Sequence, residues 1–456
     1  MKIYRFPIES IFILLMFSLF AACQDQATSP EDEQINDGNG DVNLFINAYG
    51  GSESDFGFHT IHLQDGGYIV VGRTASSDGD FSGKNNNNHD FFILKTDDTG
   101  NIEWVNTYGG TETDLGIAAA ETSNGYIIGG RFQSNSGIFT GLLIGTSNLF
   151  LMKLDTDGNQ QWLETFGGSE FDSFGSMDTT PDGGFIVSGY TTSNDGIFSD
   201  LNPGDRSAFL IKTNGSGSIE WVEIYGGTDD DRGNSVATAP GGGYILGGQT
   251  KSDDGDFDGL SVSDEMDAYM LKVDATGNKE WAVIFGGSEN EEGRGVTAGE
   301  DGSFLLTGMT PSSDGDFSGF EVEENDLFVV KLNSDGLKEW ITTLGGSGRD
   351  YGNSISPSPN GGYILTGAVE SDDGDFSAAN TGFFNIPLIK LDNAGNTEWI
   401  RIFGGNSWDQ GTYVTPTQNN GYLITGATRS SDADFTDFDR VANDVVLIKT
   451  DSEGGT

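Results

Sequence analysis

Short apolar runs alternate with glycine- and acid-rich turns along most of this chain, and one stretch shows the pattern well. Within Asn325–Ser377, runs of β-branched and aromatic residues cover Leu327–Leu332, Lys338–Leu344 and Tyr363–Gly367, and a run of small residues lies near Asn353–Ser356. Runs of this length, bounded by Gly, Asn and Asp, are typical of β-strands joined by tight turns. The stretch therefore predicts a unit of four short strands.

The same unit occurs seven times along the chain. A Gly-Gly pair recurs every 58 to 60 residues, and each pair precedes a small, polar strand. A fixed period of this size indicates a repeat architecture. Seven four-stranded antiparallel units can close into a ring of blades, with the small-residue strand innermost. The first glycines of the pairs are Gly50, Gly109, Gly167, Gly226, Gly286, Gly345 and Gly404.

The two ends of the repeat predict how the ring closes. The last unit stops after its third strand, at Val445–Thr450, while the chain begins with a lone fourth strand, Asn43–Ala48. The N-terminal strand can complete the last blade, which removes exposed sheet edges. We therefore predict an all-β fold, a seven-bladed β-propeller of four-stranded antiparallel blades, closed by the N-terminal strand.

Two side chains recur at the period of the fold and predict packing. A Trp stands in the fourth strand of six units, with Phe45 at that position in the N-terminal strand, and we expect these rings to fill the gaps between blades. A Lys recurs once per unit, followed eight residues later by Glu in five units, which predicts five exposed cross-strand ion pairs. The tryptophans are Trp104, Trp162, Trp221, Trp281, Trp340 and Trp399.

These motifs together carry a family resemblance. The order DLFVVKLNSDG, W, LGGSGRDYG, GGYILTG and SDGDF resembles the bacterial seven-bladed propeller repeat called the SBBP repeat, over Asp41–Thr456. The chain departs from that pattern in its SDGDF-type loops, where SxDFP is usual, and in the Trp of the fourth strand. The resemblance implies the propeller fold and an extracellular setting, with little about activity.

The N-terminal segment predicts where in the cell the protein is located. Lys2 and Arg5 precede the apolar run Ile11–Phe20, and small residues lead to Cys23. This resembles a bacterial lipoprotein signal and implies a signal peptide over 1–22 and a lipid on Cys23. The acidic segment 23–41 reads as a flexible tether before the propeller at 42–456, and it resembles the surface-export signal of Bacteroidetes lipoproteins. The expected location is the outer membrane, facing the exterior. The alternative is an ordinary signal peptide with an incidental Cys.

The composition of the chain limits the classes of partner that we expect. The 456-residue chain has 71 acidic and 22 basic residues, a formal charge of −49. Such a surface repels nucleic acid and anionic lipid, so we expect membrane contact only through the anchor, and a protein or glycan partner. The alternative interpretation of the charge is general solubility. A single Cys excludes an internal disulfide framework.

Acidic loops between the second and third strands are candidate calcium sites. Asp carboxylates closely spaced around a Gly can surround a hard cation such as Ca²⁺. The alternative is a turn in which the Asp oxygens bond loop amides and the loop Phe plugs the blade. The candidate ligands are Asp78, Asp80, Asp254, Asp256, Asp314, Asp316, Asp373 and Asp375.

Two of these loops depart from the repeat and are unusually apolar, which is typical of partner sites. The alternative is that they fold back over their own blades. The candidate partner-binding residues are Ile138, Phe139, Leu142, Leu143, Phe383 and Phe384.

An acid also follows each Gly-Gly pair. We expect it to be architectural, the alternative being a ring of carboxylates at the axial mouth. These acids are Asp55, Asp114, Asp172, Asp231, Glu291, Asp350 and Asp409.

No catalytic motif stands out. His59, His62 and His89 are the only histidines, and the first two fall three apart in one strand, on opposite faces. The expected function is a non-catalytic binding or scaffold module. Two alternatives are an extracellular polysaccharide-acting enzyme with paired acids and a purely structural, Ca²⁺-stabilised surface protein.

Overall fold

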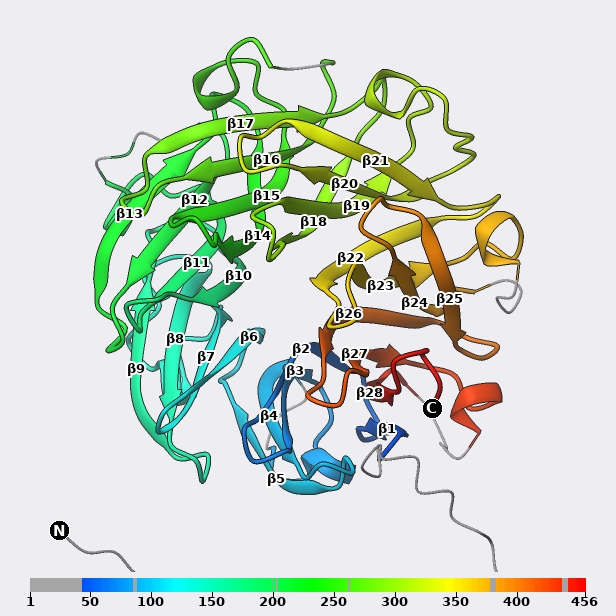
Figure 1. Cartoon of the computed structure of the whole chain (residues 1–456). Helices are drawn as coiled ribbons and strands as arrows, with labels where there is room; N and C mark the ends of the chain where they lie inside the picture. Colours follow the sequence, from blue (N-terminus) through cyan, green and yellow to red (C-terminus); the bar gives the residue numbers. More distant parts are fainter. Residues whose placement is uncertain are drawn as a thin grey trace, which may run out of the picture. The chain divides into compact units, whose positions relative to one another are not determined.

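The computed structural model describes residues 43–84, 88–199, 201, 204–260, 263–377, 383–436 and 442–456. These residues form seven four-stranded antiparallel sheets arranged in a ring (Figure 1), which confirms the predicted seven-bladed β-propeller. The signal segment, Cys23 and the tether lie outside the described residues. Among the residues described, no helix has the length and apolarity that a membrane span requires.

The innermost strand of each blade is rich in small and polar residues, as predicted, because the blades crowd at the axis. Each of these strands lies beside the centre of the ring in Figure 1. The innermost strands are β2 (Asp55–His62), β6 (Asp114–Thr122), β10 (Asp172–Thr179), β14 (Asp231–Thr238), β18 (Glu292–Ala298), β22 (Asp350–Pro357) and β26 (Asp409–Pro416).

The two middle strands of each blade are buried almost throughout, because neighbouring blades cover both of their faces. They carry the continuous apolar runs of the sequence. The second strands are β3 (Tyr68–Thr74), β7 (Gly125–Phe132), β11 (Phe185–Thr191), β15 (Tyr244–Thr250), β19 (Phe304–Thr310), β23 (Tyr363–Val369) and β27 (Tyr422–Thr428). The third strands are β4 (Asp90–Thr96), β8 (Asn148–Leu154), β12 (Ser207–Thr213), β16 (Asp267–Val273), β20 (Asp326–Leu332), β24 (Ile386–Leu391) and β28 (Asp444–Thr450).

The outer strands pack their tryptophans against the following blade, as predicted. The Trp281 ring lies 5.7 Å from Phe304 in the next blade and covers the glycine turn at Gly336, where φ is +78°. The outer strands are β5 (Ile102–Tyr108), β9 (Gln160–Phe166), β13 (Ile219–Tyr225), β17 (Lys279–Phe285), β21 (Lys338–Leu344), β25 (Thr397–Phe403) and β1 (Phe45–Tyr49).

The core is divided into layers between blades. Each hydrophobic cluster combines residues of two neighbouring sheets, for example Ile69 and Val71 of β3 with Ile128 of β7. The burial that holds the molecule together is therefore between blades, and a blade alone has no core.

The predicted lysine–glutamate pairs are present, with one correction. Lys212 Nζ lies 2.8 Å from Glu220 Oε2 and 2.9 Å from Asp182 Oδ2. The lysine side chain is nearly buried rather than exposed, because the blade edge covers its stem and only the carboxylates reach water. The five pairs are Lys95–Glu103, Lys212–Glu220, Lys272–Glu280, Lys331–Glu339 and Lys390–Glu398.

The N-terminal strand closes the ring as predicted. β1 pairs antiparallel with β28, with Phe45 opposite Lys449, so the last blade combines both ends of the described chain. The Asp55 amide then donates to the Asn443 carbonyl at 2.7 Å, which joins the seventh blade to the first.

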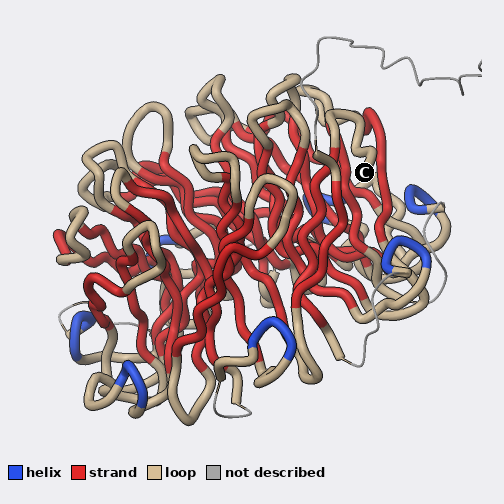
Figure 2. Tube along the Cα trace, turned by 90° about the horizontal axis from the view of Figure 1, so that it is seen from below, coloured by secondary structure: helices blue, strands red, loops and turns tan. Residues whose placement is uncertain are grey.

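The strands run between two loop-bearing ends of the ring (Figure 2). One end carries the connections from the second to the third strand, each with a short 3-10 turn, and the Gly-Gly connections between blades. We call it the acidic-loop end. The turns are Gly79–Phe81, Gly137–Phe139, Gly196–Phe198, Gly255–Phe257, Gly315–Phe317, Gly374–Phe376 and Ala433–Phe435.

Candidate functional site

The acidic loops hold the Gly-Gly connections through their carboxylates. Asp254 Oδ1 accepts a hydrogen bond from the Thr228 amide at 2.8 Å, and Asp256 Oδ2 accepts one from the Gly226 amide at 3.2 Å. Phe257 is fully buried and plugs the blade. The same first-Asp contact recurs at Asp78, Asp314 and Asp373, and the second-Asp contact at Asp80, Asp316 and Asp375.

These contacts match the turn interpretation of the loops. Among the described residues, no group of three or more His, Cys, Asp or Glu side chains is placed to hold a metal ion. A cation would have to bind beside oxygens that already accept amide hydrogen bonds. Calcium binding at these loops therefore stays a prediction.

The acids that follow the Gly-Gly pairs are architectural. Asp231 accepts hydrogen bonds from the Gly227 amide at 2.8 Å and from Ser252 Oγ at 2.9 Å, and burial raises its pKa to about 6. All seven acids are 0% exposed. Their backbone amides donate to carbonyls of the preceding blade at 2.7–3.1 Å. They fasten each blade to its neighbour and do not form a carboxylate ring at the mouth.

The apolar loop of the second blade splits between core and surface. Phe139 is fully buried and stacks on Phe132 at 4.1 Å, so it is not available to a partner. It takes the plug position that Phe257 occupies two blades further on. Ile138 and Leu143 pack partly against the same core, while Leu142 is 37% exposed. Partner binding through the exposed part of this loop stays a prediction.

Two described residues of the sixth blade's apolar loop differ in their exposure and contacts. Phe383 is 50% exposed, and Phe384 stacks on Tyr351 with ring centroids 5.5 Å apart. The Arg349 guanidinium lies 5.1 Å from the centre of the Phe384 ring. Partner binding here also stays a prediction.

The central channel contains side chains that the sequence pattern did not single out. Each innermost strand has a β-bulge, and the extra residue of each bulge lines the channel. A usable signal exists in the sequence, because these residues stand three or four positions after the recurring acid and vary between blades, with Asn alone occurring twice. They are Phe58, Ile117, Ser176, Asn234, Arg294, Asn353 and Thr412.

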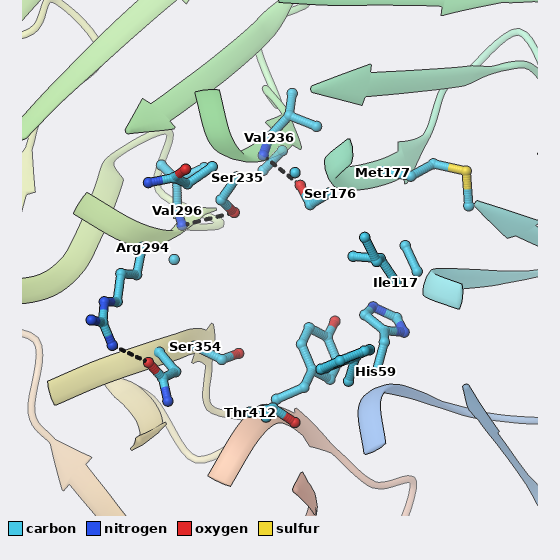
Figure 3. Close-up of a pocket in the computed structure, with 18 of the residues that line it drawn as sticks. His59, Ile117, Ser176, Met177, Ser235, Val236, Arg294, Val296, Ser354 and Thr412 are labelled. Carbon is cyan, nitrogen blue, oxygen red and sulfur yellow. Dashed lines mark hydrogen bonds between the residues drawn. The ribbon is translucent and has the colours of Figure 1, made fainter. Parts of the chain in front are cut away.

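The channel encloses a cavity of about 570 Å³ with two chemically different walls (Figure 3). Blades one and two supply Phe58, His59 and Ile117, and the third adds Met177 on the same side. From the fourth blade round to the seventh, polar bulge residues bond to the next blade along the ring, with Val236 and Val296 lying among them. The bonds are Asn234 Nδ2 to Gly293 O at 2.8 Å, Arg294 Nη1 to Asn353 Oδ1 at 2.9 Å, Asn353 Nδ2 to Gly411 O at 2.8 Å, and Thr412 Oγ1 to Gly57 O at 2.8 Å.

His59 belongs to the apolar wall. Its ring packs at a tilt of 33° against Tyr413 with centroids 3.9 Å apart, and burial lowers its pKa to about 3. The imidazole is therefore neutral at any ordinary pH. His62 instead packs against Tyr68, 5.3 Å away, as expected for the opposite face of the strand.

Aromatic rings and arginines surround the channel at the acidic-loop end. The Arg73 guanidinium lies 4.5 Å from the centre of Phe56, and Phe56 meets Trp408 edge-on at 5.8 Å. Further around the ring, Phe171 stacks on Tyr190 at 6.1 Å. These residues come from blades one and three and from connections between blades. Their meeting could not be predicted from local pattern.

Comparisons with known proteins find similarity at low sequence identity. No family model matches the chain, so the SBBP resemblance stays a resemblance. The chain is 23% identical over 324 residues to the regulatory protein FlaEY of Caulobacter vibrioides, a match covering 64% of this chain. The match spans about a third (34%) of that relative's length.

Similar solved structures include Sqt1 of Chaetomium thermophilum, at 12% identity and a TM-score of 0.46, with 90% of this chain and 84% of that chain covered. The Pan2 WD40 domain of Neurospora crassa is similar at 9% identity and a TM-score of 0.46, covering 88% and 89%. A puromycin hydrolase is similar at 12% identity and a TM-score of 0.47, covering 89% and 55%.

Proposed function

We propose that this protein is a non-catalytic binding module that takes a glycan or protein segment at the acidic-loop end and into the central channel. The scaffold is sevenfold, so a site with one specific ligand has to break that symmetry. The channel breaks it through the bulge residues, which are of six different types in the seven blades.

The divided channel wall is the observation that carries this proposal. Ligand sites combine apolar surface with a few convergent polar groups, and the cavity offers Ile117 and Met177 on one side and Arg294 and Asn353 on the other. Its volume of about 570 Å³ suits the end of a chain or one or two rings.

The same lining favours binding over hydrolysis of a polysaccharide. Glycosidic bond cleavage generally uses a pair of carboxyl groups on either side of the bond. Asp178 is the carboxylate among the residues that line the cavity. The recurring acids at the blade junctions are buried away from it, so they do not supply a second group.

A binding screen with a channel-filling variant tests the proposal. Isothermal titration calorimetry of residues 24–456 would be run against a panel of neutral and acidic oligosaccharides and of short peptides. We expect a panel member to bind, and Ile117→Trp to weaken that binding at least about tenfold by occupying the cavity. Leu337→Trp is the control, because Leu337 is highly exposed at the opposite end of the ring. Equal binding by wild type and Ile117→Trp would contradict use of the channel, and no binding by wild type would contradict the module.

We further propose that the module is held on the outer membrane by a lipid on Cys23, facing the exterior. The support is the sequence pattern of residues 1–41. Cys23→Ser is expected to release the protein from the membrane fraction. Retention of that variant in the membrane fraction would contradict the anchor, and resistance of the wild type to protease added to whole cells would contradict the outward orientation.

A further inference from the structure

Two arginines at the acidic-loop end stand at one repeat position. Arg73 of β3 and Arg131 of β7 are the penultimate residues of the second strands of blades one and two. In the ladders they lie opposite Phe56 and Leu115. The other blades carry uncharged residues at this position: Tyr190, Gln249, Met309, Ala368 and Ala427.

Among the described residues, no carboxylate forms an ion pair with either guanidinium. Arg73 Nε and Arg131 Nη1 are buried without a hydrogen-bond partner in the described structure. Their neighbours are rings: Phe56 and Phe58 lie 4.5 Å and 5.9 Å from Arg73, and Phe171 lies 5.3 Å from Arg131. The chain has 71 acidic residues, yet within its described part these two half-buried cations in the same region have no acidic partner.

Other arginines near the channel show the usual arrangement. Arg232, Arg294 and Arg349 form ion pairs with Asp230, Glu292 and Glu370 at 2.7–2.8 Å. Carboxylates are thus within reach of arginines elsewhere on this end, and the absence of one at Arg73 and Arg131 is local.

The surroundings of Arg73 are electropositive. Burial lowers the pKa of Arg73, and the charge of Arg131 lowers it further. Burial also lowers the pKa of His89, with added contributions from Arg73 and Lys84, and His89 Nδ1 is buried without a partner. Unsatisfied donors and like charges cost free energy in the empty state, and an anion would remove that cost.

The pair lies at the rim of the cavity. Phe58, which Arg73 approaches, and Leu115, which pairs with Arg131 in the ladder, both line it. Beyond the arginines, the Trp408–Phe56 contact and the Phe171–Tyr190 stack offer half-buried aromatic rings on either side.

We propose that Arg73 and Arg131 form a subsite for the carboxylate of one acidic sugar in an otherwise neutral oligosaccharide. This inference rests on the proposed binding function and names its ligand class. Guanidinium and carboxylate groups match in planar, charge-assisted hydrogen bonds. The aromatic rings pack against the C–H faces of sugar rings, and the amide and hydroxyl groups of the polar channel wall suit a hydroxyl-rich chain.

The protein's net charge decides between one acidic sugar and a polyanion. A chain of uronates would be repelled by a surface of formal charge −49, whereas a single carboxylate meets the local positive field of the pair. The ligand therefore carries its charge at one position, beside the neutral part that enters the channel.

Calorimetry with matched sugars tests the subsite. The probes are xylo-oligosaccharides with and without one glucuronate substituent, cello-oligosaccharides ending in glucuronate or glucose, and polygalacturonate. We expect wild type to bind the singly acidic member of a pair about tenfold or more tighter than its neutral partner. Arg73→Gln and Arg131→Gln should each reduce that preference, by weakening binding of the acidic member much more than binding of its neutral partner. Arg401→Gln, on the outer strand β25, is the matched control.

The outcomes separate this inference from the function on which it rests. Equal affinity for acidic and neutral partners, or stronger binding of polygalacturonate, would overturn the subsite and leave glycan binding intact. Binding of peptides and of no saccharide would overturn the subsite and keep the module. No binding at all would overturn both. The unliganded Arg73→Gln variant should melt at or above the wild-type temperature, because it loses an unpaired buried cation; a large fall would indicate a structural role instead.

Discussion

At the scale of single residues, two of the junctions between blades are versions of one another that differ by one atom. Between the second and third blades, Asn148 Nδ2 donates to Asp172 Oδ2 at 3.2 Å and to the Gly168 carbonyl at 2.9 Å. Between the fifth and sixth blades, Asp326 takes the place of the asparagine beside Asp350. A carboxylate cannot donate, so the second version needs a proton that the first does not.

Burial, together with the charges of Asp350 and Asp375, raises the pKa of Asp326 to about 7. A raised folded pKa means that the native state binds more protons than the unfolded chain, whose Asp titrates near 4. The stability due to this group is complete below about pH 4 and is lost as the pH rises through about 7.

Asp326→Asn tests this junction. We expect the variant to be more stable than wild type at pH 8, by about 1–3 kcal/mol, because the amide donates where the carboxylate is unpartnered. At pH 4 the difference should largely vanish. Urea unfolding at both pH values measures it. The reciprocal Asn148→Asp should lose stability at pH 8. If the difference in unfolding free energy between each variant and wild type is the same at pH 4 and at pH 8, the proton at this junction has no role.

At the scale of elements, the loop between the second and third strands works as a clip. Its first Asp holds the Gly-Gly connection, its 3-10 turn reverses the chain, and its Phe fills the gap between blades, as Asp254, Gly255 and Phe257 show. The clip explains why the loop recurs in every blade, including the third, which lacks the second Asp. The second blade lacks both, and there Ser136 Oγ accepts the hydrogen bond from the Thr111 amide at 2.9 Å.

Asp254 substitutions separate the clip from a calcium site. Asp254→Ala loses the hydrogen bond from the Thr228 amide, so its free energy of unfolding should fall by about 1 kcal/mol. Its melting temperature should therefore be lower than that of wild type in Ca²⁺ and in chelator alike. Asp254→Asn keeps an acceptor oxygen and should melt near wild type in chelator. Calcium binding requires that Ca²⁺ raise the wild-type midpoint and that Asp254→Asn reduce this rise. A midpoint insensitive to Ca²⁺ would assign these carboxylates to the loop alone.

At the scale of the whole molecule, stability depends on closure. Each cluster of the core lies between two blades, and the layer between blades seven and one combines Leu423 and Leu447 with Tyr68 and Val70. Phe45 of β1 contributes to the same layer. Without β1, the edge of β28 and this layer would face water.

Removing β1 tests the closure. Deletion of residues 24–49 should lower the melting temperature by several degrees or more and promote association, because an unpaired edge strand is left exposed. Deletion of residues 24–41, which leaves β1 in place, is the control and should melt like the longer form. Scanning calorimetry and size-exclusion chromatography measure both effects. Equal melting of the two truncations would show that the blades hold together without the N-terminal strand.

The periodic features of the chain were predictable because each depends on neighbours in sequence. Strand positions follow from apolar runs and Gly turns, and the Trp and Lys repeats predicted the contacts of Trp281 and Lys212. The candidate site was less predictable. Phe139 lies in a loop whose composition predicted an exposed partner site, but its side chain is buried and plugs the blade. The reason is that the 3-10 turn puts Phe139 at the same position in its blade as Phe257.

The sequence by itself determined the number of blades, their strand order and the strand that closes the ring, since hydrophobic period and turn residues act locally and repeat. Tertiary structure alone decided what the channel and its rim contain. Phe56 meets Trp408 and Thr412 bonds to Gly57 only after 352 or more residues have been wound around one axis. The neighbouring blades likewise decide whether a carboxylate of the described chain lies within reach of Arg73 and Arg131, and no local sequence pattern predicts this.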